Sequence, residues 1–161
     1  METPLPMQDT PEETWRIACH EAGHAVVGVR HKIPIEFIEI GEGENGEVSF
    51  SFSPIDRPTG KPSLTEISQW QQAYAAGAAA EQLLFGHYRE YGSCHDRNLH
   101  NEWEKLRHQM RREGWDRDIH SAIKILDRES VEKVARALVR AEKLSGEDVH
   151  KLLGCILPWE Q

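Results

Sequence analysis

The sequence lacks the patterns that mark disulfide-bonded, membrane-spanning and nucleic-acid-binding proteins. Its three cysteines, Cys19, Cys94 and Cys155, cannot all pair, and none has the Cys-x-x-Cys spacing, so we expect no disulfide scaffold. The longest strongly apolar runs, 73–80 and 25–29, are far shorter than the roughly 20 residues that cross a bilayer. A net charge of −8 argues against nucleic acid as a partner, because phosphate binding needs a concentrated basic surface.

The start of the chain and its charge pattern support the same reading. Residues 1–6 are acidic and proline-rich, without the basic start or the apolar core of a secretion signal. We therefore expect a cytoplasmic protein without a membrane anchor. The basic stretch 105–112 is interleaved with glutamates, which predicts a solvated helix face rather than a nucleic-acid site. The length favours one domain over 10–161, preceded by a flexible N-terminal segment over 1–9.

The first half of the chain predicts a helix followed by a β-hairpin. Residues 10–13, Thr-Pro-Glu-Glu, supply an N-cap, a proline for the first helical position and a glutamate three residues after the cap. Apolar residues then recur at three- and four-residue steps as far as 29 or 30, which predicts one helix. The β-branched stretch 33–40 predicts a strand. After the glycine-rich turn 41–46, apolar residues alternate with serines over 48–53, which predicts a half-buried second strand.

The second half of the chain predicts helices. Ser63 and Glu66 form a capping box, and Gly86 is a C-cap, so a helix is expected between them after the proline-bearing loop 53–62. A polar loop, 87–95, follows. Further helices are expected over 96–113, 117–127, 130–143 and 146–153. The predicted fold class is α+β and predominantly α-helical: a long helix, a β-hairpin and then a helical bundle.

The first predicted helix carries a His-Glu-x-x-His motif made of His20, Glu21 and His24. Residues four apart lie on the same face of a helix, so both imidazoles can be directed at one cation. Glu21 is rotated about 100° around the axis, where it can reach a water molecule on the metal without ligating the ion. Zinc in such a site lowers the pKa of water towards about 7, and the glutamate acts as general base. The alternative is a histidine pair without a metal.

The sequence near the motif does not complete the metal site. A catalytic zinc has three protein ligands and an open position. A metzincin would carry glycine and histidine three and six residues after the second motif histidine, where this chain has Val27 and Arg30. His31 lies off the metal face, so the third ligand must come from further along the chain. The mid-helix Gly23 costs about 1 kcal/mol relative to alanine, which indicates a close packing contact there.

Four segments of the chain carry further information: the motif helix at 19–28, Ala-Gly-Ala-Ala-Ala-Glu-Gln-Leu-Leu-Phe-Gly at 76–86, Gly-Ser-Cys-His-Asp at 92–96, and the helical stretch 135–153. In the same order, they resemble the zinc helix, the Ala-Gly-Arg-Ala-Ala-Glu helix, the Gly-Ala-Ser-Asn-Asp turn and the C-terminal helices of the protease domain of the FtsH family of ATP-dependent zinc metalloproteases. The resemblance implies the FtsH-type peptidase fold. It also implies zinc on His20, His24 and Asp96, the last from the third segment. Cys94 and His95 are rival ligands by chemistry, and an N-cap is the alternative role for Asp96.

The resemblance also suggests roles for two residues of the second segment. Glu81 matches the glutamate of the family's segment, and we expect it to hydrogen-bond a ligand histidine; a charge on the helix surface is the alternative. Ala78 replaces the family's arginine and so removes a cation. Cys19, although next to the first ligand, is expected to be a small buried residue that does not point at the metal.

The expected function is therefore that of a zinc metallopeptidase, independent of ATP by itself. It would hydrolyse peptides or unfolded protein segments, because no glycine-rich loop followed by Lys-Ser/Thr marks an ATPase module in these 161 residues. A separate ATPase or adaptor chain would be a partner, and the family's hexameric ring suggests a homo-oligomer. The alternative is a zinc-binding, non-proteolytic interaction or regulatory module.

Two further features have alternative readings. The stretch 48–53 is either an edge strand that receives an extended substrate beside the zinc, or an ordinary hairpin strand packed on the zinc helix. Trp15, Trp70 and Trp103 occupy helix-compatible positions and are expected in the core rather than in a substrate pocket.

Overall fold

Six α-helices and a three-stranded antiparallel sheet make up the part of the chain that the structure, a computed structural model, describes: residues 10–41, 45–51 and 60–154. The elements are α1 (Glu12–Arg30), β1 (Ile35–Gly41), β2 (Asn45–Phe50), α2 (Leu64–Phe85), a 3-10 turn (Tyr91–Ser93), α3 (Cys94–Glu104), α4 (Gly114–Ile125), α5 (Arg128–Ala141), β3 (Lys143–Ser145) and α6 (Gly146–Leu153). The predominantly helical α+β class is confirmed.

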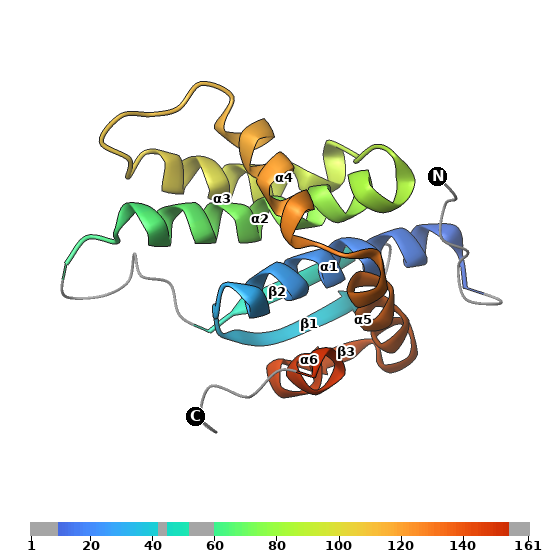
Figure 1. Cartoon of the computed structure of the whole chain (residues 1–161). Coiled ribbons are helices and arrows are strands. Elements are labelled where there is room, and N and C mark those ends of the chain that lie inside the picture. Colours follow the sequence, from blue (N-terminus) through green and yellow to red (C-terminus); the bar gives the residue numbers. More distant parts are fainter. Residues whose placement is uncertain (1–9, 42–44, 52–59, 155–161) are drawn as a thin grey trace.

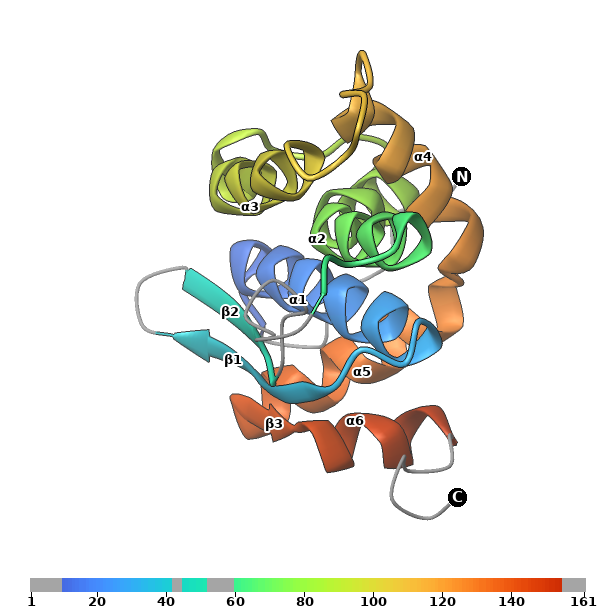
Figure 2. The ribbon, with the colours of Figure 1, turned by 90° about the vertical axis from the view of Figure 1, so that its left-hand side faces the viewer.

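Helix α1 lies at the centre of the molecule, between α2 on one side and the sheet with α5 and α6 on the other (Figures 1 and 2). Every residue from Trp15 to Val29 is buried. The contact with α2 is close because it is made through small residues: a Cβ added at Gly23 would lie 2.5 Å from the backbone oxygen of Ala76 and 2.6 Å from the Cβ of Ala80. The packing contact predicted at Gly23 is confirmed.

The sheet has the order β2-β1-β3, so the predicted hairpin is present with β2 at one edge. Ile38 in β1 pairs with Val48 on one side and with Leu144 of β3 on the other. The sequence did not predict β3, which has only three residues between α5 and α6. The residues of β2 from Val48 to Phe50 are partly buried, as expected of a half-buried strand.

The predicted helix ends agree with the structure at several points. The hydroxyl of Ser63 accepts a hydrogen bond from the backbone N–H of Glu66 at the start of α2. Gly86 ends that helix in the left-handed conformation, with φ of 84°. At the start of α1, Pro11 rather than Thr10 occupies the N-cap position, and no side chain caps the helix. The last helix runs over 146–153, as predicted.

The prediction of one helix over 96–113 was wrong. Helix α3 starts at Cys94, inside the predicted loop 87–95, and ends at Glu104; residues 105–113 form turns and bends before α4. The side chains of Arg107 and Arg111 donate hydrogen bonds to Gln71 of α2, and Arg111 also pairs with Asp118 of α4; these contacts with other helices outweigh the helix propensity of the segment. Helix α4 therefore begins three residues before the predicted 117, and α5 begins two residues before the predicted 130.

The core confirms the expectations for the tryptophans and for Cys19. Trp15, Trp70 and Trp103 are buried, and the last two stack with ring centroids 5.3 Å apart. Cys19 is fully buried, and burial raises the pKa of its thiol far above the ordinary value. None of the helices in the described ranges has the length and apolar character needed to traverse a bilayer. The expectations for 1–9, for most of the loop 53–62 and for the end of the second strand concern residues outside the described ranges.

Candidate metal centre

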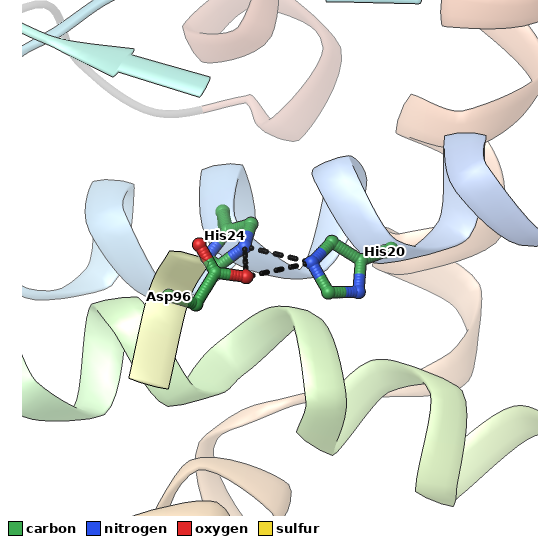
Figure 3. Close-up of side chains that lie close together, drawn as sticks. All are labelled: His20, His24 and Asp96. Atoms are coloured by element: carbon green, nitrogen blue, oxygen red, sulfur yellow. Dashed lines mark hydrogen bonds and ion pairs between the residues drawn. The ribbon is translucent and has the colours of Figure 1, made fainter. Parts of the chain in front are cut away.

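Three potential ligand atoms, two from α1 and one from α3, converge beside α2 (Figure 3). The Nε2 atoms of His20 and His24 lie 3.1 Å apart, and the Oδ2 atom of Asp96 lies 2.9 Å from the first and 3.1 Å from the second. All three residues are buried, and within the described ranges they form the one group of this kind that could hold a metal ion. The structure thus brings together the three residues that the sequence had named.

Local structure explains why the three side chains meet. His20 and His24 stand one turn apart on the same face of α1, and Asp96 lies in the first turn of α3. Helix α2 packs on both α1 and α3 and presents Gly77 to the site. A Cβ at Gly77 would lie 2.3 Å from Nε2 of His20 and 2.5 Å from Nε2 of His24. The two imidazoles therefore occupy space that a side chain on α2 would fill.

Hydrogen bonds on the far side of each imidazole fix which nitrogen faces the site. The Nδ1 atom of His20 lies 2.9 Å from the carboxylate of Glu81, and that of His24 lies 2.7 Å from the backbone oxygen of Ala73. Both partners are acceptors, so both Nδ1 atoms carry the proton and donate it. In the neutral imidazoles the two Nε2 lone pairs then face each other and the Asp96 oxygen. Three acceptors within 3.1 Å of one another repel one another unless a proton or a metal ion lies between them, so this group could hold a metal ion.

The pKa shifts of the three residues favour a proton at that place when no metal is bound. Burial alone would lower the pKa of His20, but hydrogen bonds with Asp96 and Glu81 outweigh it and raise the pKa to about 10. The pKa of His24 is also raised: burial opposes the rise, and the Asp96 carboxylate drives it. Conversely, the neighbouring imidazoles hold the pKa of Asp96 well below its ordinary value although burial opposes this. The charge pattern is that of an anionic cradle for a cation.

The spacing of the three atoms fits zinc. With zinc-to-ligand distances of about 2.0–2.1 Å, the ligands of a tetrahedral site lie roughly 3.3 Å apart. The observed separations of 2.9–3.1 Å need only a small expansion. Two imidazoles and one carboxylate are a donor set that zinc accepts, and three protein ligands leave a fourth position open. The residues therefore fit a zinc ion held by His20, His24 and Asp96.

Glu81 hydrogen-bonds His20, as expected, and is not a charge on the helix surface; it also connects the site to a buried ion-pair network that the sequence did not predict. Its side chain is fully buried, with one oxygen on His20 and the other accepting hydrogen bonds at 3.1 Å from both Arg16 and Arg89. Arg89 also pairs with Glu13. Against the cost of burial, His20 and Arg89 hold the pKa of Glu81 below its ordinary value, so the carboxylate is charged. Two arginines thus fix the acceptor that orients the first ligand.

Glu21 lies beside the three ligands in a cleft. Two adjoining hollows of about 450 and 660 Å³ share His20, Glu21 and Gly46 in their lining. Burial raises the pKa of the Glu21 carboxyl, against the pull of the two imidazoles. A Cβ at Gly46 would lie 2.6 Å from Oε1 of Glu21, so β2 crosses directly over the carboxylate. The cleft is thus bounded by an edge strand on one side and by the start of α3 on the other.

The other candidate residues do not join the ligand cluster. Cys94 and His95 are exposed at the start of α3; both line the cleft, but neither belongs to the group around Asp96. The N-cap role for Asp96 is wrong, because the helix begins two residues earlier and the carboxylate faces the imidazoles. His31 contacts Gln72 and is away from the site, as expected.

Sequence reasoning missed three residues of the site: Gly77, Gly46 and Arg16. Gly77 carried a usable signal, because a glycine inside a helix is costly and its cost indicates a close neighbour. Gly46 looked like part of a turn, and its contact with Glu21 depends on how the hairpin packs on α1. No local pattern marked Arg16, since its partner Glu81 lies 65 residues away.

Comparison with known proteins adds no assignment. A scan against protein-family models finds no match, and a search of curated proteins finds no similar sequence at a significant level. The resemblance to the FtsH family stays a prediction based on the segments described above.

Proposed function

We propose that the protein is a zinc-dependent metallopeptidase that hydrolyses peptide bonds in peptides or unfolded protein segments. One observation carries the proposal: Glu21, a carboxylate with a raised pKa, lies in a cleft beside three convergent metal-ligating atoms. The four ordered segments that resemble the FtsH protease domain support it, and in this reading the fold is of that family's peptidase type.

Each residue has a defined task in the proposed reaction. When bound, zinc supplies Lewis acidity, which makes a water molecule nucleophilic near neutral pH and polarises the peptide carbonyl. Glu21 accepts a proton from the attacking water and delivers it to the leaving amine as the C–N bond breaks. General-base catalysis is most effective when the pKa of the base lies near the working pH, and burial raises the pKa of Glu21 in that direction.

The edge strand β2 gives the substrate a place to bind. Gly46, Glu47 and Val48 line the hollow next to the metal ligands, and β2 has no neighbour on its outer side in the described sheet. An extended peptide that added to this edge would pass its backbone across Glu21. The same strand also packs on α1, so it serves both roles considered from the sequence.

The size of the cleft limits the substrate. Hollows of about 450 and 660 Å³ hold a few residues of an extended chain, not a folded domain. A folded substrate would have to be unfolded first, by a separate ATPase or adaptor chain. The substrate class that the cleft fits by itself is a peptide or an unfolded segment.

Metal analysis and peptide cleavage test the proposal together. Purified protein should contain about one zinc per chain, and His24→Ala should remove it. A peptide library should be cut by the wild-type protein and not by Glu21→Gln, which keeps the ligands and removes the base. Zinc retention with no cleavage by either protein would instead support a non-proteolytic zinc-binding module. Wild-type protein that takes up no zinc would exclude both.

A further inference from the structure

The helix that carries the third ligand is held in place by polar contacts. Four residues of α3 are buried, namely Asp96, His100, Trp103 and Glu104, and three of them are ionisable. Asp96 and His100 are four residues apart, so they share one face of the helix. One turn beyond His100, Glu104 continues that face. The rotation of α3 about its axis therefore depends on what His100 and Glu104 bind.

His100 is bound by α4. Its Nε2 atom lies 2.6 Å from a carboxylate oxygen of Asp118, and both side chains are at most 2% exposed. The other ring nitrogen, Nδ1, is buried and has no hydrogen-bond partner among the described residues. A buried polar atom without a hydrogen-bond partner is destabilising, a cost that an apolar residue would not incur. What the imidazole contributes at this position is the bond to Asp118.

Glu104 is bound by the segment between α3 and α4. Arg111 contacts Glu104 at 3.0 Å and Asp118 at 2.5 Å, so one guanidinium bridges the two carboxylates. Gln71 on α2 donates to Glu104 at 2.6 Å. Although burial opposes it, the hydrogen bonds from Arg111 and Gln71 lower the pKa of Glu104 to about 2. Both carboxylates are thus tied to a common cation at the junction of α2, α3 and α4.

We propose that Asp118 is a positioning residue for the metal centre, acting through His100 on Asp96. By fixing the buried face of α3, the Asp118–His100 bond aims the Asp96 carboxylate at the two imidazoles. Asp118 itself does not touch the metal site. Loss of a residue that hydrogen-bonds a ligand directly weakens metal binding about 10- to 100-fold. Asp118 acts one step further out, through His100 and the helix, so we expect a loss of about tenfold.

The inference rests on the metal-binding half of the proposed function, and zinc affinity tests it without reference to cleavage. Asp118→Asn keeps the size of the side chain and removes its charge. Competition against a chelator should show zinc affinity about tenfold weaker. Cobalt(II) loaded in place of zinc should show a changed visible absorption spectrum, because the spectrum reports the ligand geometry.

Two further variants separate positioning from general destabilisation. Val149→Ala, in the fully buried face of α6, removes core packing far from α3 and should leave both the zinc affinity and the cobalt spectrum unchanged. Glu104→Gln alters the same face of α3 from another position, and carries the test if Asp118→Asn does not fold. Its zinc affinity should fall as well, while its unfolding temperature is compared with that of Val149→Ala.

The outcomes of this experiment are distinct from those of the cleavage test. Wild-type protein and the two cluster variants with equal zinc affinity and equal cobalt spectra would overturn the inference and leave the peptidase standing. Wild-type protein that binds zinc but cuts no peptide, with weakened zinc binding in Asp118→Asn, would overturn the peptidase and support the inference. Wild-type protein that binds no zinc would overturn both.

Discussion

The two histidines and the aspartate of the metal centre belong to helices that are held by different kinds of contact. Helix α1 is buried along its length and packs on α2 through glycine and alanine, at a distance that leaves no room for larger side chains. Helix α3 buries one large apolar residue, Trp103, and otherwise depends on ion pairs and hydrogen bonds. Packing is non-directional, whereas a hydrogen-bonded cluster defines an angle. The first side of the site, with the two histidines of α1, is therefore held by close packing. The second side, with Asp96 of α3, is held by hydrogen bonds and ion pairs that fix the orientation of the helix.

Gly77→Ala changes the closest contact between α2 and the two histidines of α1, and should have the largest effect on zinc binding. The added Cβ would overlap the metal-facing nitrogens of His20 and His24, so stoichiometric zinc binding should be lost, and peptide cleavage with it. Gly92→Ala is the matched control, because a Cβ there meets nothing within 4 Å. Zinc content by elemental analysis measures the result. Full zinc content in Gly77→Ala would show that the imidazoles are not confined by α2.

Glu81→Gln should have the next largest effect, because it weakens the acceptor that fixes the proton on Nδ1 of His20. We expect zinc affinity to fall about 10- to 100-fold while the protein still folds. The exposed Glu129→Gln provides a control for the loss of one negative charge. Chelator competition measures both variants. If Glu81→Gln and Glu129→Gln bind zinc equally well, the Glu81–His20 hydrogen bond does not contribute to zinc affinity, and packing alone holds the histidines of α1 in place.

Gly23→Ala should lower stability more than metal affinity. The new Cβ would press on the backbone of α2 at Ala76, which cannot move as a side chain can, and overpacking of this kind costs about 1–3 kcal/mol. Gly41→Ala, whose Cβ would make only ordinary contacts of 3.7–3.8 Å, is the control. Denaturant unfolding gives the two free energies. Comparison with Asp118→Asn tests the contrast directly. Gly23→Ala should lower the free energy of unfolding more than the zinc affinity, and Asp118→Asn should lower the zinc affinity more than the free energy of unfolding.

The smallest expected effect is a pH dependence of the unfolding temperature of metal-free protein, caused by His20 and His24 beside Asp96. The pKa of His20 rises from 6.5 to about 10 on folding, so its contribution to the stability of the metal-free protein is complete below pH 6.5 and lost as the pH rises through about 10. The raised pKa of His24 acts in the same direction. The thermal unfolding temperature of metal-free protein should therefore fall over this window. In zinc-loaded protein the imidazoles are already deprotonated, so a fall of equal size there would contradict the assignment.

The side of the site held by close packing was largely predictable from the sequence, and the side held by hydrogen bonds and ion pairs was not. The N-cap at Ser63, the periodicity of α1 and the costly Gly23 are local signals, and each is confirmed. Asp96 was identified through the resemblance to a family rather than through spacing. Its approach to His20 joins residues 76 positions apart, which no local rule describes.

The errors concentrate around α3 for a physical reason. Residues 105–113 contain good helix formers, but outside the helix Arg107 and Arg111 both donate hydrogen bonds to Gln71 of α2, and Arg111 also pairs with Asp118 of α4. Glu113 adopts a left-handed φ of 57° and allows α4 to start in a new direction. Contacts with a helix more than 35 residues earlier in the chain depend on the finished fold, so composition and periodicity do not reveal them. The strand β3 was missed for the same reason, since its three residues are defined by pairing with β1.

The glycine–alanine contact between α1 and α2 also determines how an ion could be exchanged. An ion cannot leave past the Nδ1 side of either imidazole, because the Glu81 carboxylate contacts that side of His20 and the backbone oxygen of Ala73 contacts that side of His24. Helix α2 lies against both Nε2 atoms at Gly77 and closes that path as well. The route left among the described residues leads through the cleft over Glu21. A peptide bound there would stand in the exit path, so the residence time of the metal should lengthen while substrate is bound. If the proposed peptidase function holds, replacement of the ion would then pass through the same opening as the peptide substrate.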